Sequence, residues 1–363
     1  MRKQRSKKRI VGWLGAIVLL AGLAVGIYKY NASPVPPMSI STWLVDWQWQ
    51  SGLHDYVEVA ERLTSLHVFA LYYDDRDAPY FTSELEAALP DLFDDRQAVP
   101  VDSMESAKGA EGETVPDMYL TVVNDIWQQD GTVIHKDTGL VSRLIASAGS
   151  REKHVQELVD IVLRYDFDGL ELDYERIGDE DWERLKVFIS ALHDELTASG
   201  KSLRVLLEPR MPIEQLSLPA GPDYVMMAYN LYGTHSGPGP KADQAFLREL
   251  AARMDHVPGE SVIALASGGF DWTTDGHVTA VTEEDARQLA DQPGAVERRD
   301  EASGALVFDY ADEQGVRHTV WYADADTFKL WFATLQEEGI HRVALWRLGG
   351  WSEQSLQWLA ETQ

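Results

Sequence analysis

The sequence contains no cysteine among its 363 residues, and it has only 32 basic side chains against 59 acidic ones, for a formal net charge of -27. Without cysteine the chain can have no disulfide, no thiolate zinc site and no cysteine nucleophile. The excess of acid argues against binding to a nucleic acid, because affinity for a phosphate backbone comes from clustered Lys and Arg. A hydrophobic content of 45% nevertheless indicates a folded protein with a substantial core.

Several common catalytic motifs are also missing. No GxGxxG follows the first apolar run, and the chain has no P-loop, no HExxH and no GxSxG. Its ten histidines are scattered rather than grouped at ligand spacing. We therefore expect neither a cofactor nor a metal.

The few basic residues are unevenly distributed. Six of them lie in the first nine residues, and the following run over 10–27 is 18 residues long and uncharged. As a helix this run would extend about 27 Å, close to the thickness of a membrane core. We expect a cytoplasmic stub over 1–9, a transmembrane signal anchor over 10–28 and a linker over 29–38, with the acidic remainder outside the cell. Secretion after cleavage near 24–26 is the alternative.

From residue 39 onward, apolar runs of strand length alternate with stretches of helical periodicity, of which 151–164 is the clearest. The eight predicted strands are 39–45, 66–73, 118–123, 167–174, 203–207, 224–229, 262–266 and 343–346. Eight such repeats are typical of an α/β fold of the (β/α)8 TIM-barrel type, here over 39–363, rather than of an open doubly wound sheet.

Two stretches interrupt this alternation. Residues 99–116 form a polar segment that predicts a loop. Residues 270–326 separate the seventh strand from its helix and are too many for a simple connection, so they predict a small α+β insertion. Within it, the apolar–polar run 305–310 followed by a turn at 312–315 predicts a hairpin.

The segment DGLELDYE over 168–175 carries the strongest chemical signal. Because side chains alternate between the two faces of a strand, Glu171, Asp173 and Glu175 share one face. A solvated face would suit an antiparallel sheet, whereas in a parallel barrel these acids point inward, toward the C-terminal mouth. Crowded carboxylates lose solvation and repel one another, so at least one should have a raised pKa, as a general acid requires.

This segment resembles the DGxDxDxE signature of glycoside hydrolase family 18, which contains chitinases and endo-N-acetylglucosaminidases. The residues Met-Ala-Tyr-Asn at 227–230 are similar to the family's M-x-Y-[DN] motif, and Trp346 to the tryptophan that floors its central sugar site. The segments 269–272 and 320–322 resemble those of the bacterial spore-germination and cortex-lytic branch.

The resemblance implies hydrolysis of β-1,4 links next to N-acetylglucosamine by a substrate-assisted retaining mechanism, in peptidoglycan or a chitin-like glycan. Glu175 would act as acid and base, Asp173 would orient the acetamido group, and Tyr229 would bind its carbonyl oxygen. Glu171 stands where the family has Asp, which shares a proton with the next acid; we therefore expect an altered pH dependence. The expected substrate-binding residues are Trp346, Met227, Asn230, Asp168, Trp43 and Asn124.

Some of these residues have a second interpretation. Trp43 and Trp47 alternate at the end of the first predicted strand, and either could stack on a sugar or pack in the core. Asn124 could line the cleft or hold a loop by hydrogen bonds. Glu208 and Arg210, after the fifth strand, could bind each other or the substrate.

The expected partners are an N-acetylglucosamine-containing polysaccharide and, through the N-terminal helix, a membrane. Peptidoglycan is the leading substrate, because a tethered enzyme reaches the adjacent wall more readily than distant chitin. The alternative is a non-catalytic glycan-binding or cell-wall scaffold protein on the same barrel. Retention of Glu175 favours the enzyme.

Overall fold

The computed structural model describes residues 37–83, 85, 86, 89 and 115–362. The predicted cytoplasmic stub and signal anchor, most of the linker and most of the polar segment 99–116 lie outside the described residues. Within the described part, no helix is both long and apolar enough to cross a membrane.

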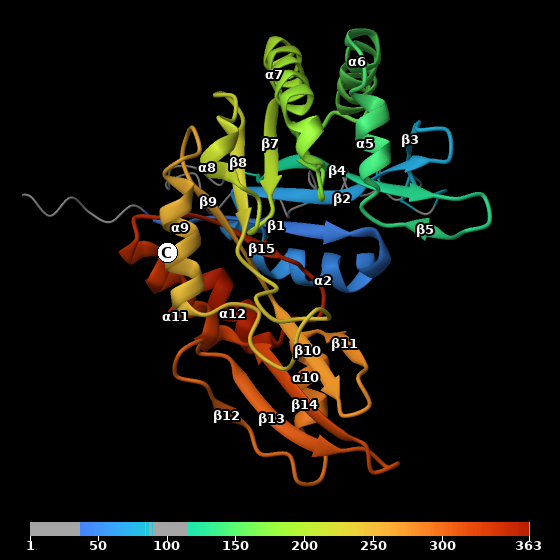
Figure 1. The fold of residues 1–363 in the computed structure, drawn as a ribbon. Helices are drawn as coiled ribbons and strands as arrows, with labels where there is room; N and C mark the ends of the chain where they lie inside the picture. Colours follow the sequence, from blue (N-terminus) through green and yellow to red (C-terminus); the bar gives the residue numbers. More distant parts are fainter. Residues whose placement is uncertain (1–36, 84, 87–88, 90–114, 363) are drawn as a thin grey trace, which may run out of the picture. The chain divides into compact units, whose positions relative to one another are not determined.

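Eight parallel strands close into a barrel in the order β1, β2, β4, β6, β7, β8, β9 and β15, with β15 pairing back to β1 (Figure 1). Their bounds are Ser39–Val45, Ser65–Asp74, Asp117–Trp127, Gly169–Asp173, Ser202–Leu207, Asp223–Met227, Val262–Ala266 and Arg342–Trp346. These strands are almost wholly buried, as expected where helices cover a parallel sheet. The predicted (β/α)8 barrel is confirmed.

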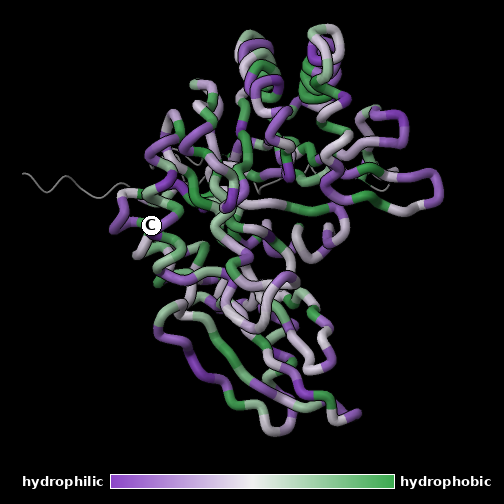
Figure 2. The backbone as a smooth tube through the Cα atoms, in the orientation of Figure 1, coloured by the Kyte–Doolittle hydropathy of each residue, from purple (hydrophilic) through white to green (hydrophobic). Residues whose placement is uncertain are grey.

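Amphipathic helices pack on the outside of the barrel. In α6 (Ala148–Arg164) the side chains of Val155, Leu158, Val159 and Val162 are buried at helical spacing, and a capping box at Ser147 begins the helix. Figure 2 shows hydrophobic and hydrophilic stretches alternating along the helices. The others are α2 (Trp49–Val59), α5 (Thr138–Leu144), α7 (Trp182–Ala198), α8 (Ile213–Leu216), α9 (Gln244–Met254), α11 (Ala325–Glu337) and α12 (Glu353–Glu361).

Two short strands extend the sheet at its C-terminal edge. β3 (Pro79–Tyr80) pairs antiparallel with β2, and β5 (Val133–Ile134) pairs antiparallel with β4. Neither strand was predicted, because two residues carry no periodic pattern. The segment after β5 turns back over the barrel mouth and brings Lys136 there.

Between β9 and α11 the chain forms a separate antiparallel sheet, at the position of the predicted α+β insertion. Its strand order is β11-β10-β14-β13-β12, and the predicted hairpin is present as β13 and β14. The bounds are β10 (Gly268–Thr273), β11 (Val278–Val281), α10 (Glu283–Ala290), β12 (Arg298–Arg299), β13 (Leu306–Ala311) and β14 (Arg317–Ala323).

The insertion sheet begins two residues before the predicted start, at a pair of glycines. A side chain on Gly269 would place its Cβ 1.7 Å from the carbonyl oxygen of Trp321, and Gly268 has a φ of 61°. Only glycine tolerates both this close approach and this conformation. The pair lets the chain leave β9 and enter the second sheet directly.

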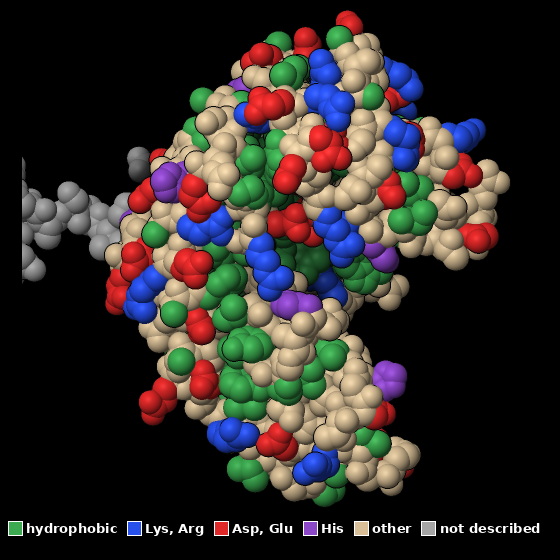
Figure 3. All heavy atoms as spheres, in the orientation of Figure 1, with side chains coloured by type: hydrophobic (Ala, Val, Ile, Leu, Met, Phe, Trp, Pro, Cys, Tyr) green, Lys and Arg blue, Asp and Glu red, His purple; other side chains and the backbone are tan. Residues whose placement is uncertain are grey.

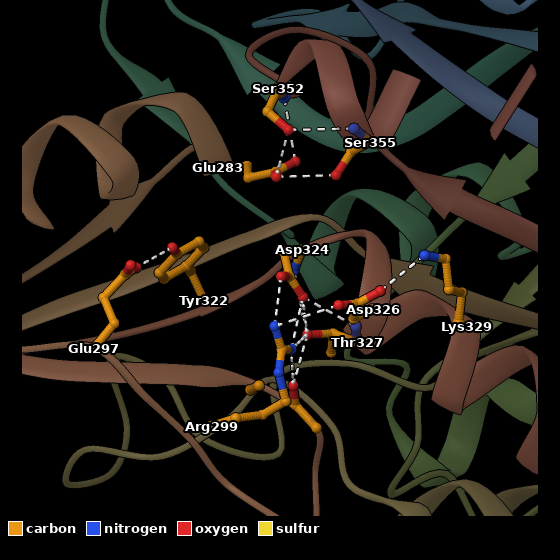
Figure 4. A network of polar contacts seen from close by, with 12 residues as sticks. Glu283, Glu297, Arg299, Tyr322, Asp324, Asp326, Thr327, Lys329, Ser352 and Ser355 are labelled. Atoms are coloured by element: carbon orange, nitrogen blue, oxygen red, sulfur yellow. Dashed lines mark hydrogen bonds and ion pairs between the residues drawn. The ribbon is translucent and has the colours of Figure 1, made fainter. Parts of the chain in front are cut away.

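Polar contacts hold the insertion against the barrel helices (Figure 4). The Glu283 carboxylate of α10 accepts hydrogen bonds from the hydroxyls of Ser352 (2.7 Å) and Ser355 (2.9 Å) at the start of α12. Arg299 of β12 donates to Asp324 (2.7 Å), the residue that caps α11. The insertion is therefore tied to the helices on both sides of β15.

Candidate active site

The floor of the barrel interior is built around the fully buried carboxylate of Glu171. It accepts hydrogen bonds from Trp43 Nε1 (2.5 Å) and Thr121 Oγ1 (2.8 Å). Arg204 Nε lies 3.0 Å and His67 Nδ1 3.1 Å from its other oxygen. Thr121, Glu171 and Arg204 are in register on adjacent strands, so the parallel pairing itself brings these groups together.

Glu171 is ionised at neutral pH. Burial opposes its ionisation, but His67 and Arg204 outweigh that effect and lower the pKa of Glu171 to about 2. Burial, reinforced by Arg204, lowers the pKa of His67 to about 4. His67 is therefore neutral at pH 7, and we assign the counter-charge of Glu171 to Arg204.

Asp173 lies one step nearer the mouth on β6 and is only 3% exposed. Burial raises its pKa to about 7; Lys136 opposes this rise, whereas Glu175 and Glu171 contribute to it. Thus one member of the acidic trio has the raised pKa expected from crowding. Because Asp173 and Glu175 interact, this proton belongs to the pair.

Lys136, which the sequence analysis did not identify, forms ion pairs with both outer carboxylates. Its Nζ lies 2.5 Å from Glu175 Oε1 and 3.3 Å from Asp173 Oδ2. Burial disfavours the ammonium, but Asp173 and Glu175 raise the pKa of Lys136, so it stays cationic. Its backbone N–H donates to Asp125 (2.8 Å), which fixes the segment after β5 at the mouth.

Asn124 holds the backbone of the catalytic segment. Its side-chain amide donates to the Glu175 carbonyl (3.1 Å) and accepts from the Glu175 N–H (3.1 Å). It also donates to the carbonyl of Asp137, the residue that caps α5. Asn124 is fully buried. It therefore holds the Glu175 backbone by hydrogen bonds, which is the alternative to lining the cleft.

A cavity of about 700 Å³ opens above these carboxylates at the C-terminal ends of the strands, on a hollowed face where hydrophobic, acidic and basic side chains meet (Figure 3). Asp173 and Glu175 line it, and burial followed by these carboxylates raises the pKa of the Tyr229 phenol, which stays a donor. The other predicted residues on its wall are Met227, Asn230 and Trp346. Aromatic side chains of Trp47, Phe69, Tyr72 and Trp127 form the wall over β1, β2 and β4.

Four predicted site residues lie outside the lining of this cavity, and Asn124, described above, is one of them. Glu171 and Trp43 belong to the floor, with the Trp43 ring 5.6 Å from that of Trp346. Asp168 lies at the opposite end of β6, where its carboxylate accepts from the Met118 N–H (2.8 Å). Of the two tryptophans, it is Trp47, 57% exposed, that faces the cavity.

A larger cleft of about 1210 Å³ lies between α2, α12 and the insertion. Its lining includes Glu58, Glu284 and Glu353, but no member of the acidic trio. Among the described residues, no group of three or more His, Asp or Glu side chains is arranged to hold a metal ion. The 700 Å³ cavity is therefore the candidate active site, because it joins volume to convergent titratable groups.

Residues 135–350 match the glycosyl hydrolases family 18. The chain belongs to glycosyl hydrolase family 18. The match begins next to Lys136 and includes the acidic segment of β6, Tyr229 and Trp346. The resemblance seen in the sequence is thereby confirmed.

Several relatives of this family 18 chain come from Bacillus species. It is 25% identical over 278 residues to the cortical fragment-lytic enzyme of Bacillus subtilis, covering 69% of this chain and 61% of that protein. It is 24% identical over 227 residues to the putative sporulation-specific glycosylase YdhD of the same organism, covering 58% of this chain and 54% of the relative. The chain thus spans little more than half of the length of these two relatives.

Solved structures show the same family 18 fold. The Bacillus cereus spore cortex-lytic enzyme SleL superimposes with a TM-score of 0.74 at 19% identity, over 91% of this chain and 75% of that one. The chitinase of Chromobacterium violaceum superimposes with a TM-score of 0.70 at 19% identity, over 89% of this chain and 98% of the chitinase.

Proposed function

We propose that this family 18 protein is a glycoside hydrolase that cleaves β-1,4 links next to N-acetylglucosamine with retention of configuration. One observation carries the proposal: Asp173, Glu175 and Tyr229 face a single cavity whose other side carries Trp346 and Trp47. Two carboxyl groups and a phenol beside aromatic surfaces suit acid–base attack on a stacked sugar.

In the proposed reaction, Glu175 donates its proton to the glycosidic oxygen as the C–O bond breaks. The carbonyl oxygen of the substrate's 2-acetamido group bonds to the anomeric carbon from the opposite face, giving an oxazolinium. Asp173 orients the acetamido N–H and stabilises the positive charge, and Tyr229 donates to the carbonyl oxygen. Glu175 then takes a proton from water, which opens the ring with net retention.

Peptidoglycan is the proposed substrate, supported by the names of the cortical fragment-lytic and sporulation-specific relatives. We propose that the N-terminal apolar run anchors the enzyme in the cell membrane with the barrel outside, secretion after cleavage being the alternative. The anchor is tested by fractionating cells that express the full chain and sequencing the N-terminus of the product.

Removal of N-acetyl groups from the substrate tests the mechanism. The full chain should hydrolyse chitooligosaccharides or peptidoglycan with retention of anomeric configuration, followed by NMR, and should be about a hundredfold slower on the de-N-acetylated glycan. The reason is that the amine has no carbonyl oxygen to attack the anomeric carbon. Equal rates on both glycans would contradict substrate assistance. Binding without cleavage of either would favour the glycan-binding scaffold.

Replacing Lys136 by methionine should move the alkaline limb of the pH–activity profile upward by at least about one pH unit. Activity falls when the Asp173–Glu175 pair loses its proton, at a pKa of about 7 for Asp173. Removing the adjacent cation raises the pKa of the pair, so the proton is kept to higher pH. Lys136→Arg preserves the charge, so its alkaline limb should move by less than half of the shift seen in Lys136→Met. An unmoved limb in Lys136→Met would contradict this role.

A further inference from the structure

Two basic side chains stand together on the rim of the cavity. Arg210 follows β7, His235 lies in the loop after β8, and both are exposed and line the cavity. Arg210 Nη2 and His235 Nε2 are 3.3 Å apart. A guanidinium has only donors, so Arg210 donates and His235 accepts, leaving the imidazole neutral with its proton on Nδ1.

This rim pair has no carboxylate partner in the described part of the chain, where no ion pair is formed by Arg210 or His235. The nearest acid in sequence, Glu208, accepts instead from the backbone N–H of Arg176 at 2.7 Å. An unpaired guanidinium facing a cavity is notable in a chain with a net charge of -27.

The other basic groups of the cavity are already paired. Lys136 contacts Asp173 and Glu175, and His135 Nδ1 lies 2.7 Å from Asp125. The charge of Lys136 is therefore balanced within the protein, and the His135 ring already has a carboxylate partner. The Arg210 charge is the part of the described lining that remains available to a ligand.

The strand order places the rim pair on one side of the scissile position. Going around the barrel, β6 with Glu175 stands between β4, whose end carries Trp127, and β7, which is followed by Arg210. A glycan whose cleaved bond lies at Glu175 would meet the aromatic wall on one side and the rim pair on the other.

We propose that Arg210 and His235 bind a carboxylate carried by the glycan on the β7–β8 side of Glu175. This inference rests on the proposed function and narrows its substrate to anionic N-acetylhexosamine glycans. A guanidinium binds a carboxylate through two parallel hydrogen bonds, with His235 fixing its orientation. In peptidoglycan the carboxylate is the lactyl group of muramic acid or that of a stem peptide; chitin has neither.

The test compares three glycans of equal length made of N-acetylglucosamine and N-acetylmuramic acid. The first carries free lactyl carboxylates, the second carries lactyl amides, and the third bears stem peptides. The full chain should favour the first over the second by about tenfold in kcat/KM, and Arg210→Gln should remove most of that preference. His235→Gln should reduce it by a smaller factor. If only the third glycan, with stem peptides, is cleaved faster than the lactyl amide, the bound carboxylate is that of the peptide.

Arg176→Gln is the matched control, because this exposed arginine lies on the neighbouring loop outside the cavity lining. It should keep the parent's preference. Equal kcat/KM for all three glycans would overturn the anion site while leaving the hydrolase intact. If no glycan is cleaved, calorimetric titration of the same glycans into the full chain still tests the site. Equal affinity of parent and Arg210→Gln for the carboxylate glycan would then overturn it.

Discussion

Replacing Glu175 by glutamine should lower kcat on N-acetylated glycans by about 10³-fold without changing the fold. The amide has the same size and can still accept a hydrogen bond from Lys136 and leave the Asn124 backbone contacts in place. It cannot donate a proton to the leaving oxygen, nor take one from the attacking water. The measurement is kcat on purified peptidoglycan or chitooligosaccharide, with thermal unfolding as the check on folding.

A substrate with an acidic leaving group separates proton donation from a structural effect. Such a leaving group departs without a proton. In Glu175→Gln the rate of the first step, cleavage of the glycosidic bond, should therefore fall by only about tenfold. Glu183→Gln, the same change at an 85% exposed side chain of α7, should match the parent. An equal loss on both substrates would show that Glu175 acts by supporting the structure rather than as an acid.

Replacing Arg204 by methionine should lower the free energy of unfolding by about 3–5 kcal/mol. Arg204 is 4% exposed, lies 3.0 Å from the Glu171 carboxylate and donates to Ser41 Oγ at 3.1 Å. Its removal leaves a buried anion whose remaining polar neighbours, Trp43, Thr121 and the neutral His67, carry no charge. Urea unfolding of the two proteins at pH 7 measures the difference.

The deficit of Arg204→Met should diminish as the pH falls. In the parent, the pKa of Glu171 is about 2 in the folded state against an ordinary value of 4.5, so its contribution is present at neutral pH. Without Arg204 the folded-state pKa rises above 4.5, and Glu171 destabilises the fold at higher pH. That penalty disappears as the pH falls toward 4.5, where the side chain takes up a proton.

The double variant Glu171→Gln/Arg204→Met completes the test, because it removes both charges from the floor. It should be more stable than Arg204→Met alone at pH 7. A single variant as stable as the parent, or a deficit that does not vary with pH, would contradict an ionised Glu171 held by Arg204.

The barrel strands could be predicted from the sequence because they are short runs rich in apolar residues and are separated by helical periodicity. The first strand and the strand at 262–266 have the predicted bounds. The bounds of the first helix, α2 (Trp49–Val59), are harder to predict from the sequence. Its first turn is partly buried and carries no apolar pattern, and its buried face includes Gly52 and Asp55, which periodicity does not identify. A side chain at Gly52 would meet Leu44 at 2.4 Å, so this glycine permits close packing on β1.

Part of the site could be predicted for the same local reason. Alternation along one strand is sufficient to place Glu171, Asp173 and Glu175 on one face. It cannot tell which of Trp43 and Trp47 reaches the cavity, because Trp47 follows the strand, in a 3-10 turn that reorients the side chain. Nor could any pattern identify Lys136, a single base in a short loop.

By itself, the sequence determined the fold class, the order of the elements and an inward row of acids, because periodicity and alternation depend only on neighbouring residues. The tertiary structure decided how each acid is charged. Glu171 meets Arg204 from β7 and Thr121 from β4, whereas Asp173 meets Lys136 from the segment after β5. These partners lie 30 or more residues apart in the chain, and only closure of the barrel brings them into contact. Two acids on one face of one strand therefore have opposite pKa shifts.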